Sequence, residues 1–277
     1  MAPRLFACFG RGASSSSTTT DKPASSPDLH DTADQAVEEQ RRGGAVLMEL
    51  FSSQGCGTST DAEAIASRVG RGDLGLDDVP VVVLAWHVDY WDYRGWKDPF
   101  GSSVWTVRQK AFVESLQLDT LYTPQVVIQG QTQCLGTDEN SIADAARAAP
   151  RFPSPAMKAT FHKSSPDMLQ VSFSGTLGSK VDSNGADVMV VLYESGLVTN
   201  CERGENKGRA LNNDHVVRRS EKLLSVKDVS AKKKLSGSVQ FPLWESFNRA
   251  NCGIVLFVQN RSLQTFGVQH FQIPDTI

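Results

Sequence analysis

Cys56 is the residue of this chain best suited to chemistry, because it stands where an expected strand gives way to an expected helix. An apolar run, 46–51, precedes it, and a helical pattern follows it. The positive end of a helix dipole and its unpaired N–H groups favour a thiolate, the nucleophilic form of cysteine. Ser59 stands where a dithiol enzyme carries its second cysteine, so an outside thiol would have to resolve any disulfide formed at Cys56. The alternative is that Cys56 is only a small buried residue.

Thr123 and Pro124 open a second expected strand further along the chain. A proline that opens a central strand removes a backbone donor from the ladder and needs a structural reason. We expect a cis peptide bond between Thr123 and Pro124 that faces the thiol and exposes the Thr123 backbone to a substrate. An ordinary trans proline at the entry to a strand is the alternative.

The segment 87–100 is dense in aromatic and acidic side chains and follows the apolar run 79–86. His87 could tune or deprotonate the Cys56 thiol, and Tyr90 and Trp91 could wall a pocket at the carboxyl end of the sheet. The alternative is a packed loop whose aspartates cap turns. A metal site is not expected, because no known motif matches the spacing of His87, Asp89, Asp92 and Asp98.

Helical and strand patterns alternate along residues 44–152, and they are the elements that must position these side chains. Strand–helix–strand units imply parallel strands with right-handed crossovers, and a hairpin adds an antiparallel edge. The pattern predicts an α/β thioredoxin-like domain. The expected elements are strand 46–51, a helix around 62–69, strand 79–86, helix 104–116, strands 126–129 and 132–135, and helix 142–149.

The pattern changes to a period of two in residues 153–277, with turn signals between the apolar runs. This predicts an all-β sandwich-like domain after the thioredoxin-like domain. A polar, Gly-rich stretch, 202–209, interrupts the strand patterns, and it could recognise an anion, dock on the first domain or form a solvated hairpin loop. Residues 1–43 are rich in Ser, Thr, Asp and Pro and are predicted to form a disordered N-terminal arm.

The net charge of −3 over 277 residues gives no electrostatic reason to expect nucleic acid as a partner. No apolar run reaches the roughly 18 residues of a membrane-spanning helix. The five cysteines follow neither a metal-binding nor a disulfide-framework spacing, which favours a reducing compartment. We therefore expect a soluble cytoplasmic protein. A plastid protein is the alternative, because the start of the chain is rich in Ser and Thr and poor in acids.

Three segments, 49–56, 86–100 and 122–130, together resemble an uncharacterised thioredoxin-like family, catalogued as domain of unknown function twelve twenty-three. Residues 204–209, with 216–218, resemble the signature of its second domain. Bacterial relatives usually carry a signal peptide and a second cysteine at the position of Ser59. This chain has neither, so it looks like the plant-type branch of the family. The family has no assigned reaction, and the resemblance therefore implies a fold more than a function.

A second resemblance concerns mechanism, because the run Cys56-Gly-Thr-Ser59 is similar to the site of monothiol glutaredoxins. By that similarity, Thr123, Pro124 and Gln125 would cradle glutathione, with the Thr123 backbone holding its cysteine. Asp138, at the start of a helix, would hold the γ-glutamyl amine. Glutathione is thus implied as a co-substrate, and no bound cofactor is expected.

The leading hypothesis is a thiol exchange protein that acts on glutathione or protein thiols. Cys56 would be the nucleophile, with Ser59 and His87 assisting it. The first alternative is a non-catalytic binding or scaffold protein that uses loop 87–100 and the second domain. The second alternative is a redox sensor that forms a disulfide between Cys56 and Cys134.

Overall fold

The computed structural model describes residues 43–276, so the predicted arm lies outside the described residues except for Gly43. The helices and strands predicted for residues 44–152 are present. They are β1 (Val46–Ser52), α2 (Ser59–Gly70), β2 (Val81–His87), the short 3-10 helix η1 (Asp92–Arg94), α3 (Ser103–Ser115), β3 (Gln125–Ile128), β4 (Thr132–Leu135) and α4 (Glu139–Ala148).

The alternating apolar runs at 157–161, 169–173, 188–192, 239–241 and 254–258 form strands, as predicted, but four further strands after residue 153 were not predicted from the sequence. A second 3-10 helix, η2 (Arg249–Asn251), lies among these strands. The strands are β5 (Ala156–Ser165), β6 (Met168–Thr176), β7 (Ala186–Glu194), β8 (Leu197–Asn200), β9 (Ala210–Asn213), β10 (Val216–Val226), β11 (Leu235–Pro242), β12 (Cys252–Asn260) and β13 (Thr265–Gln272).

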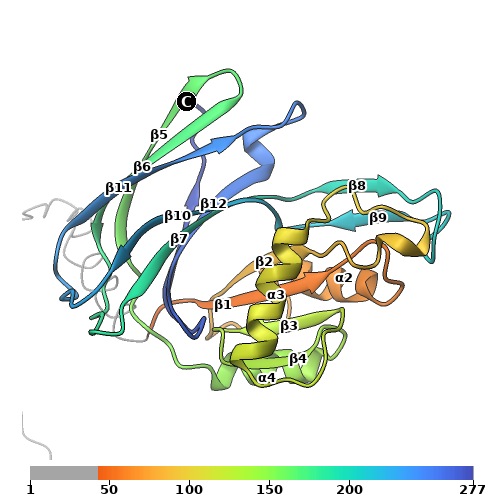
Figure 1. The fold of residues 1–277 in the computed structure, drawn as a ribbon, viewed down its shortest axis with the longest axis horizontal. Helices are drawn as coiled ribbons and strands as arrows, with labels where there is room; N and C mark the ends of the chain where they lie inside the picture. Colours follow the sequence, from red (N-terminus) through yellow and green to blue (C-terminus); the bar gives the residue numbers. More distant parts are fainter. Residues whose placement is uncertain (1–42, 277) are drawn as a thin grey trace, which may run out of the picture. The chain divides into compact units, whose positions relative to one another are not determined.

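One mixed, 8-stranded sheet joins the two halves of the chain in the order β13-β12-β7-β10-β2-β1-β3-β4 (Figure 1). The junction is the parallel contact of β10 with β2, where Val216 pairs with Ala85 and the Ala85 N–H donates to the carbonyl of His215 at 2.8 Å. The predicted fold, a thioredoxin-like α/β domain followed by a separate β-sandwich, is therefore wrong. The sheet does not divide at the boundary predicted between residues 152 and 153.

The error has a physical cause. Apolar alternation shows which face of a strand is buried, but it does not show which strand lies beside it. The edge of β2 needs a hydrogen-bonding neighbour, and the chain provides β10 from more than a hundred residues away. Two small sheets, β11-β6-β5 and β8-β9, complete the strands of residues 43–276.

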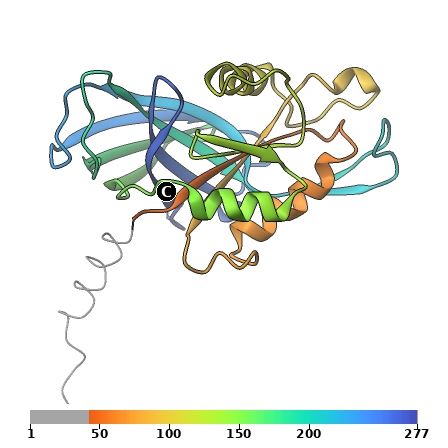
Figure 2. The same cartoon turned by 90° about the horizontal axis from the view of Figure 1, so that it is seen from below.

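Three apolar clusters hold these layers together. Helices α2 and α4 pack on one face of β1, β2 and β3, and α3 lies on the other face (Figure 2). The sheet of β5, β6 and β11 packs against β7, β10 and β12. The cluster under α3 continues across the junction, because Phe51 and Trp86 share it with Val255 and Phe257 of β12.

A partly buried ion pair fixes α3 on the sheet. Arg108 donates to both carboxylate oxygens of Glu49, at 2.6 and 2.9 Å, and its guanidinium lies 4.7 Å from the ring centroid of Trp86. The side chains of Trp105 and Phe112 face the sheet from the same helix, whereas Val104 and Val107 face solvent. Both polar contacts and apolar burial therefore orient α3. This explains why the apolar pattern of this helix is weak.

No helix within residues 43–276 is long and apolar enough to cross a membrane.

The shared core predicts that both halves of the chain unfold together. Replacing Phe51 or Phe257 by alanine should lower the free energy of a single unfolding transition by about 3–5 kcal/mol, because both side chains are fully buried in the cluster under α3. Urea denaturation followed by circular dichroism measures this. Val198→Ala, on an exposed side chain, is the control and should change the free energy by less than about 0.5 kcal/mol. Two transitions, each shifted by only one of the phenylalanine variants, would contradict the shared core.

Candidate functional site

Cys56 lies in the turn between β1 and α2, as predicted, and its sulfur faces polar groups. Its Sγ atom is 3.4 Å from the Thr58 hydroxyl and 3.7 Å from the carbonyl oxygen of Thr123. The residue is only 6% exposed, so the thiol is less open to solvent than the position at a turn suggests. The surroundings are those of a polar, recessed site.

The groups around the sulfur favour its ionised form. Burial raises the pKa of the Cys56 thiol, but hydrogen bonds from Ser59, Thr123 and Thr58 stabilise the thiolate and lower the pKa below its ordinary value. Ser59 is itself buried, and its Oγ accepts a hydrogen bond from the Ser53 backbone at 3.4 Å. The serine that replaces a second thiol thus contributes a hydroxyl to the sulfur.

The peptide bond between Thr123 and Pro124 is cis, as expected, and the Thr123 carbonyl faces the sulfur. The indole of Trp91 donates to the Thr123 hydroxyl at 2.6 Å and so fixes this segment. The Tyr90 hydroxyl donates to Gln109 at 3.2 Å, and burial raises the pKa of Tyr90 to about 12. Trp91 therefore lies beside the thiol as predicted, and Tyr90 is a neutral neighbour.

The two remaining predicted glutathione contacts are used within the protein. Gln125 is fully buried, and its side-chain oxygen accepts a hydrogen bond from Gln109 at 2.9 Å. Asp138 is exposed at the start of α4, where its carboxylate accepts hydrogen bonds from the backbone and hydroxyl of Ser141 at 3.0 and 2.7 Å. Asp138 thus caps its helix, and the Gln125 side chain is out of reach of a ligand.

His87 is fully buried between two carboxylates, and these, rather than Cys56, are its charged partners. Its Nδ1 lies 2.7 Å from Asp98 and its Nε2 lies 3.2 Å from Glu63. Burial lowers the pKa of His87, but the charges of Asp98 and Glu63 outweigh that effect and raise the pKa to about 10. His87 is therefore an imidazolium at neutral pH, and it cannot act as the base that deprotonates Cys56.

Asp98 carries the influence of His87 to the cysteine turn. The carboxylate that pairs with His87 also accepts a hydrogen bond from the Gln54 backbone at 2.7 Å, two residues before Cys56. It accepts another from the Phe100 backbone at 2.9 Å. Sequence reasoning treated Asp98 as a turn cap or a weak metal candidate and did not foresee this link.

Asp89 and Asp92, the other carboxylates considered as metal ligands, have separate hydrogen-bond partners. Asp89 accepts a hydrogen bond from the Thr106 hydroxyl at 2.7 Å, and Asp92 accepts one from the backbone of Asp98 at 3.1 Å. Within the described part of the chain, no three His, Cys, Asp or Glu side chains are placed to hold a metal ion.

The Gly-rich stretch docks on the cysteine turn, which was one of the three open interpretations. The buried amide of Asn206 donates to the carbonyls of Gln54 and Cys56 at 2.9 and 3.3 Å. The Gly57 N–H donates to Glu205 at 2.8 Å, and Glu205 also pairs with Arg94. The many polar residues of this stretch suggested a contact. The sequence did not show which part of the protein they contact, because that depends on how the sheet is assembled.

Gln54 links the turn to the same hairpin and to the aromatic loop. Its side-chain N–H groups donate to Thr199 and Asn213 at 3.0 and 2.8 Å, and its side-chain oxygen accepts from the Trp96 indole at 3.1 Å. Sequence reasoning missed this residue, because a glutamine before a cysteine has no distinctive chemistry. The turn is held by groups from three separate parts of the chain.

The other cysteines of the described region are free and differ from Cys56 in acidity. Burial raises the pKa of Cys134 to about 11 and that of Cys252 to about 12, and it also raises the pKa of Cys201. Cys56 is thus the thiol best suited to react as a thiolate among residues 43–276.

The paired carboxylates predict an unusual titration of His87. Because its pKa is raised above the unfolded value of about 6.5, the stability it contributes is complete below that pH and is lost as pH rises through about 10. Nuclear magnetic resonance titration of the imidazole C–H groups should show His87 still protonated at pH 8. His215 and His270, whose pKa values burial lowers, should titrate below their ordinary range.

Asp98→Asn provides the matching test of stability. The change should lower the midpoint of His87 and cost about 3 kcal/mol of unfolding free energy, since it breaks a buried pair. Asp144→Asn, at an exposed carboxylate on α4, is the control. A wild-type His87 midpoint near 6.5 would contradict the ion pair.

Solved structures with a similar fold include two that align over most of this chain. A structural-genomics protein from Agrobacterium tumefaciens aligns with a TM-score of 0.58 and 22% identity, covering 85% of this chain and 97% of the other. HBP35 of Porphyromonas gingivalis aligns with a TM-score of 0.58 and 11% identity, covering 85% of this chain and 78% of the other. At these identities the similarity concerns the fold alone. No curated protein matches the chain.

The sequence itself identifies the family, because residues 47–259 match the family model described as "Protein of unknown function (DUF1223)". That stretch includes the cysteine turn, loop 87–100 and the hairpin that docks on the turn. The predicted family membership is confirmed, and this chain belongs to the DUF1223 family.

Proposed function

We propose that the protein is a monothiol exchange protein that uses Cys56 as its nucleophile and glutathione as co-substrate. The observation that carries this proposal is the environment of Sγ, where the hydroxyls of Thr58, Ser59 and Thr123 favour the thiolate despite burial. Activation by hydroxyl groups needs no neighbouring base. The engagement of His87 by two carboxylates is therefore compatible with the proposal.

The exchange has two balanced steps. The Cys56 thiolate attacks the glutathione sulfur of a protein–glutathione mixed disulfide, forming a new S–S bond and releasing the partner protein as a thiolate. A second glutathione thiolate then attacks the glutathione sulfur bound to Cys56. This step releases glutathione disulfide and restores the Cys56 thiolate. Ser59 cannot resolve the intermediate, so the second glutathione is required.

Several neighbours would position the partner rather than react. The Thr123 carbonyl, beside the cis bond to Pro124, is the backbone group next to the sulfur, and Trp91 holds the Thr123 side chain. We still propose Asp138 as the group that holds the γ-glutamyl amine of glutathione. Its carboxylate is exposed, although it also caps α4. His87 would act through Asp98, which fixes the backbone before Cys56.

A non-catalytic binding protein is the second candidate, and the low exposure of Cys56 favours it. In this alternative the hydrogen bonds from Asn206 and Glu205 serve to close the turn, and the aromatic loop forms the recognition surface. Tyr93 on this loop is 77% exposed and is available to a partner. Replacing Cys56 by serine separates the candidates, because only the exchange protein loses function.

The cellular setting is part of the same proposal. Four free cysteines in the described region support a reducing compartment, for which we propose the cytoplasm, with the plastid as the alternative. We also place the chain in a plant-type, single-cysteine branch of its family, on the basis of Ser59.

The proposal predicts the pH dependence of Cys56 alkylation. Quantified by peptide mass spectrometry, the reaction with iodoacetamide should show a midpoint below that of a free thiol, about 8.5. Ser59→Ala should raise the midpoint, because it removes one thiolate hydrogen bond. Cys134 in the same sample is the internal control and should react only at much higher pH. A Cys56 midpoint at or above 8.5 would remove the proposed nucleophile.

A further inference from the structure

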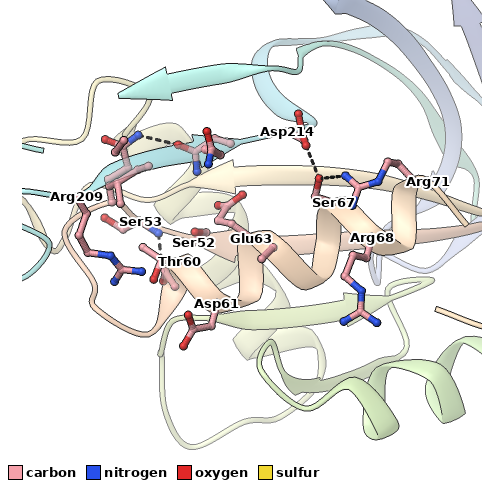
Figure 3. Close-up of a pocket in the computed structure, with 17 residues that line it drawn as sticks. Ser52, Ser53, Thr60, Asp61, Glu63, Ser67, Arg68, Arg71, Arg209 and Asp214 are labelled. Carbon is pink, nitrogen blue, oxygen red and sulfur yellow. Dashed lines mark hydrogen bonds between the residues drawn. The ribbon is translucent and has the colours of Figure 1, made fainter. Parts of the chain in front are cut away.

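A cavity of about 500 Å³ lies between α2 and the β9 strand, beside the cysteine turn (Figure 3). Of the groups that surround the Cys56 sulfur, Ser59 lines this cavity, and Cys56, Thr58 and Thr123 do not. Its walls come from the end of β1, one side of α2 and residues 209–214. The volume is within the range of about 300–1,000 Å³ that is typical of small-molecule sites.

Two residues that line this cavity carry buried side-chain oxygens with no hydrogen-bond partner. Glu63 is only 4% exposed and projects from α2 toward the hairpin, as Figure 3 shows. Its Oε1 is within ion-pair distance of His87 but is not aligned for a hydrogen bond, and its Oε2 has no partner. The hydroxyl of Ser52 is fully buried and also lacks a partner. Native proteins rarely leave such atoms unsatisfied, so they indicate a missing hydrogen-bond donor.

The charges around the buried end of the cavity favour a cationic ligand. Glu63 and Asp98 share the single positive charge of His87, and Asp98 has the shorter contact and two backbone N–H donors in addition. Glu63 is therefore the less compensated carboxylate. A charged group that is desolvated without a full partner is costly, and a cationic ligand would remove that cost.

The outer end of the cavity offers the opposite charge. Arg209 is exposed, lines the cavity and donates to Asn206 at 3.0 Å, and it forms no ion pair with any residue of 43–276. The other two arginines of the wall are engaged, because Arg68 pairs with Glu139 and Arg71 pairs with Asp73. Arg209 is thus the lining cation with donors left for an acidic ligand group.

We propose that this cavity binds a small zwitterion, such as an amino acid or dipeptide, whose ammonium group contacts Glu63 and Ser52 and whose carboxylate contacts Arg209. An ammonium group supplies three donors to the unsatisfied oxygens, and a carboxylate matches the forked donors of arginine. The exposed acid Asp61 also lines the cavity and adds to the preference for a cationic group. This site is separate from the sulfur of Cys56.

Isothermal titration calorimetry of the full chain with three matched probes tests the proposal. Glycylglycine should bind saturably with a one-to-one stoichiometry. N-acetylglycylglycine lacks the ammonium group and glycylglycinamide lacks the carboxylate, so each should bind at least tenfold more weakly. No saturable binding of glycylglycine, as expected of a cavity that holds only water, would overturn the proposal. Equal binding of the acetylated probe would overturn it as well.

Two variants assign the groups. Glu63→Gln should abolish the preference for glycylglycine over its acetylated form, and circular dichroism checks that this variant folds. Arg209→Gln changes an exposed side chain and should abolish the preference for glycylglycine over the amide, even if the first variant fails to fold. Arg147→Gln, at an arginine that does not line the cavity, should leave all three affinities unchanged. An unchanged preference in Arg209→Gln would contradict the assignment of the carboxylate.

The thiol proposal and the zwitterion proposal can be tested independently of each other. Cys56→Ser should leave glycylglycine binding unchanged, because Cys56 does not line the cavity. Loss of binding in that variant would contradict a separate site.

Discussion

The candidate site depends on a buried imidazolium held between two carboxylates. His87, at the end of β2, pairs with Glu63 on α2 and with Asp98 in the following loop, and none of the three is more than 4% exposed. Charges in such a place are tolerated only when they compensate one another. The same contacts fix α2 against the sheet and, through Asp98, the backbone of Gln54 before the cysteine. Electrostatic pairing in the core therefore sets the geometry at the sulfur.

The continuous sheet completes the site from the other side. Because β10 pairs with β2, the hairpin of β8 and β9 reaches the turn that holds Cys56. Asn206 and Glu205 then satisfy backbone groups of that turn. In a single sheet the pairing of β10 with β2 fixes the position of this hairpin. Two separate domains would leave that position free. Residues 209–214 of the hairpin and α2 also line the polar cavity.

The sequence allowed the elements and part of the site to be predicted, since both depend on local patterns. Apolar periodicity located the helices and most of the strands, but not β8, β9, β10 and β13, and the structure brings Cys56 and Thr123 together as expected. The assembly was predicted wrongly, because the β10–β2 pairing joins residues far apart in the chain. The roles of His87, Glu63 and Asn206 depend on that assembly. A buried histidine looks the same in sequence whether it faces a thiol or a pair of carboxylates.

The central claim is that hydroxyl groups lower the pKa of the Cys56 thiol in a turn that the His87 cluster fixes. Ultraviolet thiolate absorbance, measured against pH as the difference between the wild-type protein and Cys56→Ser, reports that ionisation directly. The account predicts an inflection below the value of about 8.5 for a free thiol. An inflection at or above that value would contradict it and leave Cys56 as a buried structural residue.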